Sequence, residues 1–163
     1  ERGTGTGAIA VSLASERLSW HITGVDVVEQ AVQLAQENAQ ATGLTHVRFF
    51  QSDWFSALKE QQFHLILSNP PYIAEDDPHL VQGDVRFEPL SALVADENGL
   101  ADIRQIIAHA PQQLYAKGWL VFEHGYQQAA AVRAMLETAG FNDLAGHERL
   151  TLGQWQAVEG SAC

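Results

Sequence analysis

Apolar residues along the chain gather in short runs that alternate with segments of helical period. Four runs are rich in β-branched or aromatic residues and end in polar residues or glycine; they predict buried strands at 20–26, 47–53, 63–69 and 119–125. Between them, apolar side chains recur at helical spacing over 31–39 and 129–139. The glycines that follow, Gly43 and Gly140, are typical of helix ends.

Alternating strands and helices are typical of a parallel sheet with helices on both faces. The last segments, "FNDLAGHERL" and "LTLGQWQAV", are joined by only a short connection and predict an antiparallel hairpin at the sheet edge. The expected fold class is therefore α/β, a mostly parallel doubly wound sheet with an antiparallel C-terminal hairpin. No repeat or linker divides the 163 residues, so we expect one domain over 1–163.

The N-terminal part of this predicted sheet is incomplete. The segment "GTGTG" at 3–7 predicts the turn from a first strand into a first helix, yet only Glu1 and Arg2 precede it. The first strand of a doubly wound sheet is a central one. We therefore expect the first strand to be missing, a gap in the middle of the sheet, and a chain that is a fragment of a longer protein.

Charge and composition disfavour several classes of protein. Nine Lys plus Arg against 20 Asp plus Glu give a formal net charge of -11, which disfavours binding to a nucleic acid backbone. No apolar stretch reaches the length of a membrane span, and no signal peptide layout is present, so the cytoplasm is the simplest location. The seven His show no ligand spacing, so no metal site is expected, and the single Cys163 has no internal disulfide partner.

The first two predicted strand ends carry candidate ligand-binding residues, the glycines at 3–7 and Asp26. The glycines at 3–7 let the backbone approach a ligand at a helix N-terminus; with Ala8 they also fit G-x-G-x-x-A, which leaves a nicotinamide or flavin enzyme open, and a plain tight turn is the alternative. Asp26 ends the next strand, about 20 residues on, where an acid can hydrogen-bond both hydroxyls of a ribose. Its other role is an ordinary cap of the following helix, and the two roles are compatible.

The next strand ends in "SDWF", residues 52–55. Asp53 can accept a hydrogen bond from an adenine amino group, and Trp54 can stack on the ring. A helix cap and a core aromatic are the alternative roles of these two residues.

The segment "NPPY", residues 69–72, ends another strand. A strand-terminating turn is its simplest interpretation, because proline cannot donate to a sheet ladder. The segment also suits methyl transfer to a planar nitrogen, whose lone pair is delocalised. The Asn69 side-chain oxygen and the Pro70 carbonyl can accept its two N–H groups, and Tyr72 can pack on its flat face. We expect the four strand ends to face one crevice.

Together, the glycines, Asp26, "SDWF" and "NPPY" resemble S-adenosylmethionine-dependent methyltransferases of the Rossmann-like class. "NPPY" is similar to the motif of enzymes that methylate amide or exocyclic amine nitrogens, including adenine-specific DNA methylases. The segments "DPHLVQGDVRFEPLSALVADENGLADI" (77–103) and "FEHG" (122–125) resemble the bacterial release factor glutamine methyltransferase family, PrmC/HemK. This resemblance covers essentially the whole chain.

The resemblance implies transfer of a methyl group from S-adenosyl-L-methionine to the glutamine side-chain amide in the Gly-Gly-Gln motif of class 1 peptide chain release factors. It implies that Gly3, Thr4, Gly5, Thr6 and Gly7 bind the methionine part of the cofactor, Asp26 the ribose, and Asp53 with Trp54 the adenine. It also implies that Asn69, Pro70, Pro71 and Tyr72 form the catalytic segment that clamps the glutamine amide, with Asn69 where cofactor and substrate meet. Glu88 and Pro89 fall in a loop expected to shape the substrate mouth.

Two departures from the family bear on the activity of the isolated chain, and two other functions stay open. Its members carry a helical N-terminal domain, which we expect this chain to lack, and Glu1 and Arg2 stand where the family has an Asp and an aliphatic residue. One alternative is an adenine-specific DNA or RNA N-methyltransferase, which the net charge of -11 disfavours. The other is an inactive fragment that binds only cofactor or a partner.

Overall fold

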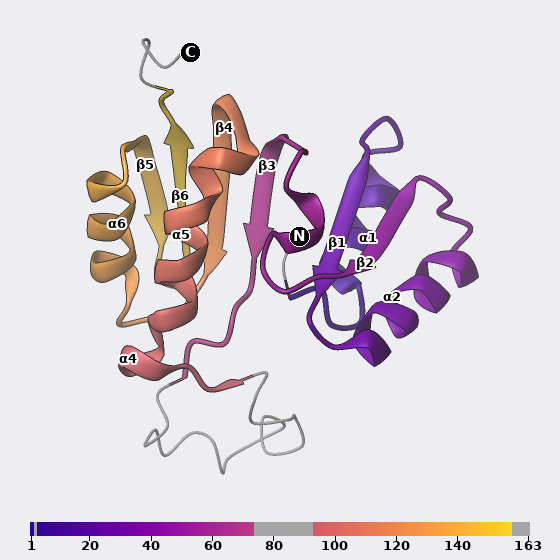
Figure 1. Ribbon diagram of the computed structural model, residues 1–163. Coiled ribbons are helices and arrows are strands. Elements are labelled where there is room, and N and C mark those ends of the chain that lie inside the picture. Colours follow the sequence, from indigo (N-terminus) through magenta and orange to yellow (C-terminus); the bar gives the residue numbers. More distant parts are fainter. Residues whose placement is uncertain (2, 74–92, 158–163) are drawn as a thin grey trace. The chain divides into compact units, whose positions relative to one another are not determined.

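The computed structural model describes Glu1, residues 3–73 and residues 93–157. The chain divides into two compact units, Glu1–Gln61 and Gln62–Cys163. Both combine strands with helices, as the sequence pattern predicts (Figure 1). None of the helices in the described ranges is long and apolar enough to cross a membrane. The expectation of a single domain over 1–163 stays a prediction.

The first unit is a parallel pair of strands with two α-helices. Its elements are α1 (Ala8–Glu16), β1 (Ile22–Asp26), α2 (Glu29–Ala41), β2 (Val47–Gln51) and the 3-10 helix η1 (Ser56–Leu58). Ile22 lies opposite Val47, and Asp26 lies opposite Gln51. The carboxyl ends of both strands therefore meet at one edge, the edge at which doubly wound sheets bind ligands.

Small residues let the helices of the first unit pack closely on its strands. Val32, Ala35 and Ala39 recur at helical spacing along α2 and share a buried cluster with Phe49 of β2. Gly7 precedes α1 with a φ of 78°, and a Cβ there would lie 2.9 Å from the Cβ of Ala35. Only glycine fits at this position, because both the backbone conformation and the packing exclude a side chain.

The second unit is a four-stranded sheet with helices packed on it. Its elements are β3 (Phe63–Ser68), α4 (Asp96–Gly99), α5 (Ala101–Gln113), β4 (Leu114–Glu123), α6 (Ala129–Thr138), β5 (Phe141–His147) and β6 (Leu150–Trp155). The strand order is β3-β4-β6-β5, with β3 and β4 parallel and the other two pairs antiparallel. Helix α5 packs on β4, and α6 packs on β5 and β6 (Figure 1). The predicted edge hairpin is confirmed.

The predicted strands and helix ends are confirmed, with one strand start displaced. β4 begins at Leu114 rather than at residue 119, because its pairing with β3 shifts register and the chain bulges around Lys117, whose φ is 65°. Such a bulge interrupts the apolar run that marks a strand in the sequence. Gly43 and Gly140, with φ of 73° and 91°, directly follow the C-caps of α2 and α6.

The predicted interruption of the sheet is present in the hydrogen bonding of the described residues: β1 and β2 form one sheet, and β3 to β6 form another. Beside β1, the Glu1 amino group donates to the Thr23 carbonyl (2.7 Å), and the Glu1 carbonyl accepts from Val25 N (2.9 Å). Gly3 N then donates to the Val25 carbonyl (2.9 Å). The chain therefore enters the first unit alongside β1 and reaches the glycines at that strand's carboxyl end.

Candidate active site

The glycine loop, residues 3–7, has the backbone of a ligand cradle. Gly3, Gly5 and Gly7 have φ of 71°, 51° and 78°, values that glycine adopts without steric cost. A Cβ added at Gly5 would meet nothing within 4 Å, so Gly5 borders open space. Thr4 is buried and Thr6 is exposed. The sequence prediction of a loop open to close backbone approach is confirmed in its geometry.

Asp26 joins the glycine loop to the end of β1. Its Oδ2 accepts a hydrogen bond from Gly5 N (3.0 Å), and its Oδ1 accepts one from Val28 N (3.0 Å). A carboxylate offers about four lone-pair sites, so the half-exposed Asp26 retains capacity for further donors. The N-cap of α2 is Val28, not Asp26. The alternative of an ordinary N-cap is therefore wrong for Asp26.

Asp53 and Trp54 follow β2 at the same edge of the first unit. Ser52 N donates to the Asp26 carbonyl (2.9 Å), which joins the two strand ends directly. Trp54 is half-buried and has a φ of 53°, a conformation that costs a residue with a side chain roughly 1–3 kcal/mol and that clusters at functional sites. The Ser52 hydroxyl donates to the Trp54 carbonyl (3.0 Å) and holds this turn.

Asp53 is exposed beside Trp54, and the N-cap of the 3-10 helix η1 is Phe55 with no side-chain cap. The helix-cap alternative for Asp53 is therefore wrong. The first unit thus brings together the glycine loop, Asp26, Asp53 and Trp54, as predicted. Their contact with a cofactor stays a prediction.

Glu1 ties the glycine loop to the start of α1. Its Oε2 accepts hydrogen bonds from the Thr4 hydroxyl (2.9 Å) and from Ala10 N (3.0 Å). Burial raises the pKa of this carboxyl above its ordinary value of 4.5, against the opposing effects of its own amino group and these two donors. Glu1 therefore holds the loop in place, and burial makes its ionised form less favourable than in water.

Stability of the chain is expected to depend on pH through Glu1. Because the folded pKa is raised, its contribution is fully present below pH 4.5 and is lost as the pH rises through the raised value. Glu1→Gln should remove this part of the slope. The measurement is the free energy of unfolding in urea from about pH 4 to about pH 8. Glu16→Gln, at the exposed end of α1, is the control; equal slopes in wild type and Glu1→Gln would contradict the assignment.

The NPPY segment, residues 69–72, begins where β3 ends in the second unit. Pro70 is buried, Pro71 and Tyr72 are half-buried, and Asn69 is exposed. No partner within the described residues binds the Asn69 side chain. Backbone bonds hold the segment beyond Tyr72, since Ile73 N donates to the Leu93 carbonyl (2.9 Å). A rigid backbone with one exposed amide is an arrangement that can orient an acceptor.

Two residues that the sequence motifs do not mark, Gln128 and Gly99, support the NPPY segment. The Gln128 amide donates to the Tyr72 carbonyl (2.9 Å), and the Gly99 backbone packs directly on that carbonyl. His124, directly after β4, is fully buried, and its Nε2 bonds the Thr151 hydroxyl (2.8 Å), which joins the end of β4 to β6. The motif "FEHG" pointed toward His124, whereas no local pattern marks Gln128.

The predicted site residues fall in both units. The glycine loop, Asp26, Asp53 and Trp54 belong to the first, and Asn69 to Tyr72 belong to the second. A shared crevice between them therefore stays a prediction. Glu88 and Pro89 lie outside the described residues. Within the described ranges, no three His, Cys, Asp or Glu side chains gather to hold a metal ion.

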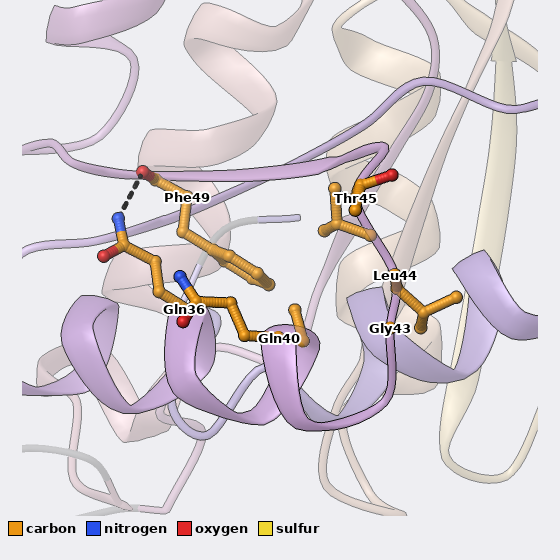
Figure 2. Close-up of a pocket in the computed structure, with 8 residues that line it drawn as sticks. Gln36, Gln40, Gly43, Leu44, Thr45 and Phe49 are labelled. Atoms are coloured by element: carbon orange, nitrogen blue, oxygen red, sulfur yellow. Dashed lines mark hydrogen bonds between the residues drawn. The ribbon is translucent and has the colours of Figure 1, made fainter.

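A pocket of about 360 Å³ lies within the first unit, between α2 and β2 (Figure 2). Its lining is apolar or neutral, and Gln36 Nε2 bonds the Phe49 carbonyl across it (3.2 Å). The full lining is Gln36, Ala39, Gln40, Gly43, Leu44, Thr45, Val47 and Phe49. It contains no charged side chain and none of the predicted site residues, so we do not place the active site there.

The family model of the methyltransferase small domain matches residues 2–84 of the chain. The chain belongs to this family. Membership confirms the prediction of a methyltransferase and of S-adenosylmethionine as its methyl donor.

The names of curated relatives are more specific than the name of the family model. The chain is 56% identical over 161 residues to the release factor glutamine methyltransferase of Vibrio cholerae, covering 94% of this chain and 56% of that protein. It is 58% identical over 159 residues to that of Pseudomonas aeruginosa, covering 94% and 58%, and 54% identical to that of Escherichia coli, covering 94% and 57%. The chain thus spans somewhat more than half the length of these relatives.

Solved structures confirm the fold class. The chain matches a methyltransferase from Pyrococcus furiosus with a TM-score of 0.71 at 15% identity, covering 95% of this chain and 73% of that one. It matches TrmN from Thermus thermophilus with a TM-score of 0.62 at 22% identity, covering 94% and 41%. The predicted Rossmann-like methyltransferase fold is therefore correct.

Proposed function

We propose that the chain is the catalytic part of a protein-glutamine N-methyltransferase that acts on the Gly-Gly-Gln motif of class 1 peptide chain release factors. The observation that carries the proposal is the identity of 54–58% with three release factor glutamine methyltransferases over 94% of this chain. The geometry of the NPPY segment supports it, because the exposed Asn69 follows a strand and adjoins the buried Pro70.

In the proposed site, the first unit binds S-adenosylmethionine. The glycine loop fits the methionine part, since its backbone borders open space at Gly5. Asp26 keeps unused lone pairs for the ribose hydroxyls, and Asp53 with the strained Trp54 suits the adenine. The bound cofactor supplies an electrophilic methyl group.

The NPPY segment orients the glutamine nitrogen, which acts as the nucleophile. A carboxamide nitrogen is a weak nucleophile, because its lone pair is shared with the carbonyl. The Asn69 side-chain oxygen and the Pro70 carbonyl accept its two N–H groups, and Tyr72 covers its flat face. The nitrogen is then held in a fixed orientation, and the accepting oxygens stabilise positive charge that develops on it. The nitrogen would form a bond to the methyl carbon while the bond from that carbon to the cofactor sulfur breaks, the electron pair remaining on sulfur, and the nitrogen would then lose one proton to solvent.

The partner in this proposal is a release factor, and direct binding of nucleic acid is not part of it. Acidic residues outnumber basic ones by 20 to nine, which repels phosphate. We place the reaction in the cytoplasm, where translation termination occurs. An adenine amine offers the same two N–H donors as a carboxamide, so a DNA or RNA adenine is the competing acceptor in the test.

The test has two stages on the same preparation. Calorimetric titration with S-adenosylmethionine is expected to show one binding site. Incubation with cofactor and a class 1 release factor is then expected to add one methyl mass to the glutamine of its Gly-Gly-Gln peptide. A release factor with Glu in place of that Gln is the control. Methylation of adenine oligonucleotides alone would refute the protein substrate, and binding without any transfer would indicate an inactive cofactor-binding fragment.

A further inference from the structure

Gln128 joins three separate segments of the second unit through one side-chain amide. Its Nε2 donates to the carbonyls of Tyr72 (2.9 Å) and Asn98 (2.9 Å), and its Oε1 accepts from Gly125 N (2.8 Å). Both N–H donors and the oxygen of this amide are therefore used by the protein. The half-buried Gln128 stands directly before α6, at its N-cap position.

The segment that Gln128 holds at Asn98 is strained. Glu97 and Asn98 have φ of 55° and 57° with positive ψ, and Gly99 has a φ of 80°, so α4 is a left-handed turn. Left-handed helical geometry costs a residue with a side chain roughly 1–2 kcal/mol. Such a turn persists only where its surroundings fix it, and strained turns cluster at functional sites.

This strained turn lies against the NPPY segment. A Cβ at Gly99 would overlap the Tyr72 carbonyl, and that carbonyl is the one that receives the Gln128 amide. Ile73 and Val94 form a parallel bridge just beyond, with Ala95 N donating to the Ile73 carbonyl (3.0 Å). The backbone that leaves Tyr72 is therefore enclosed by the turn on one side and by Gln128 on another.

The fold brings Gln128 to the NPPY segment across two neighbouring strands. β3 and β4 are parallel, with Ser68 opposite Phe122, so Asn69 and the loop after Glu123 leave the sheet at the same edge (Figure 1). Gln128 closes that loop, since its backbone N donates to the Gly125 carbonyl (2.9 Å). The side chain then reaches back to Tyr72.

We propose that Gln128 is a positioning residue, which fixes the NPPY segment against the left-handed turn at 97–99 and so sets the orientation of the acceptor amide. This inference rests on the proposed function. Gln128 acts through the Tyr72 backbone and takes no part in the chemical step. Its role requires an amide, because only an amide offers two donors and an acceptor on one rigid group.

The discriminating variant is Gln128→Glu. It has nearly the same shape, but its carboxylate cannot donate and would face the carbonyl oxygens of Tyr72 and Asn98. A negative charge at the N-terminus of α6 is favourable for the helix, which helps the variant to fold. Gln127→Glu is the matched control: the same change one residue away, at an exposed side chain whose partner within the described residues is the Tyr126 hydroxyl (2.7 Å).

We expect Gln128→Glu to lower kcat for glutamine methylation on the order of 10- to 100-fold, the effect of misplacing a reactant. The Kd for S-adenosylmethionine should stay within about twofold, since cofactor binding is assigned to the first unit. Hydrogen exchange should accelerate at the Ile73 amide, which directly follows the Tyr72 carbonyl that loses its donor, whereas the Gly125 amide keeps an oxygen acceptor in the carboxylate. Gln127→Glu should match wild type in all three measurements.

A second variant, Leu136→Ala, tests for a purely structural role, because it truncates a fully buried side chain two turns further along α6 than Gln128. It should lower the unfolding temperature without changing kcat below that temperature. If Leu136→Ala lowers kcat as much as Gln128→Glu, the positioning role is wrong. If wild type does not methylate glutamine, the proposed function fails, while hydrogen exchange still decides the inference: unchanged protection of Ile73 in Gln128→Glu overturns it.

Discussion

Replacing Asn69 with alanine is expected to lower kcat for glutamine methylation by about 100- to 1,000-fold, the usual loss when one preorganised polar group is removed from a reacting centre. The structure leaves this side chain available to an acceptor group, because Asn69 is exposed and no partner within the described residues binds its side chain. The neighbouring Pro70 is buried, so the Asn69 backbone is fixed while its amide faces outward.

Cofactor affinity should change no more than several-fold in Asn69→Ala, because the residue mainly orients the acceptor. Single-turnover rates with a release factor and calorimetry with S-adenosylmethionine give the two quantities separately. Asn142→Ala is the control, because it removes the same group from an exposed asparagine on β5, at the opposite end of the strand order from β3. It should leave the turnover rate and the cofactor affinity unchanged. Near-normal turnover in Asn69→Ala would refute the catalytic role of the NPPY segment.

Sequence periodicity was sufficient to predict the strands and helices whose buried residues follow a simple pattern. β1, β2 and β3 are short apolar runs ended by polar residues, and α2 places Val32, Ala35 and Ala39 on one face. Gly43 and Gly140 marked helix ends, because glycine adopts the left-handed conformation needed there without a steric penalty. These features depend on nearest neighbours in the chain, which a sequence displays directly.

The start of β4 and the turn at α4 could not be predicted in this way. The bulge at Lys117 and the left-handed residues Glu97 and Asn98 oppose local preference, since residues with side chains avoid positive φ. Tertiary contacts maintain them. The Gln154 side chain binds the Lys117 carbonyl (3.0 Å), and Gln128 binds the Asn98 carbonyl (2.9 Å). No sequence window contains both partners of such a bond.

In the candidate site, too, some features were predictable from the sequence and others depend on tertiary contacts. Asp26 was predictable, because its distance from the glycines and its place after a strand are visible in the sequence. Its bond to Gly5 N (3.0 Å) was not, although this bond makes Asp26 part of the glycine loop itself. Gln128 lies 56 positions from Tyr72 and resembles any polar residue before a helix. Motifs therefore located the reacting groups, and the structure was needed to find what holds them.

Asp26 accepts hydrogen bonds from both Gly5 N and Val28 N, and its replacement is the second change for which we expect a large effect. Asp26→Ala is expected to weaken S-adenosylmethionine binding by roughly 1.5–3 kcal/mol, the usual contribution of hydrogen bonds to a charged group, which corresponds to about a 10- to 150-fold rise in Kd. Two losses combine in this variant: the ribose loses its acceptor, and the Gly5 and Val28 amides lose the carboxylate that holds the loop.

Asp26→Asn separates the two losses. Its remaining oxygen can still accept from Val28 N, but its NH₂ group would face the Gly5 N–H, so two donors meet. We expect an affinity between those of wild type and Asp26→Ala. Glu29→Ala removes the same charge at an exposed position in the first turn of α2 and controls for net charge. Calorimetry with S-adenosylmethionine measures all four proteins. If Asp26→Ala binds the cofactor as tightly as Glu29→Ala, neither loss weakens binding, and Asp26 has no role in holding the cofactor.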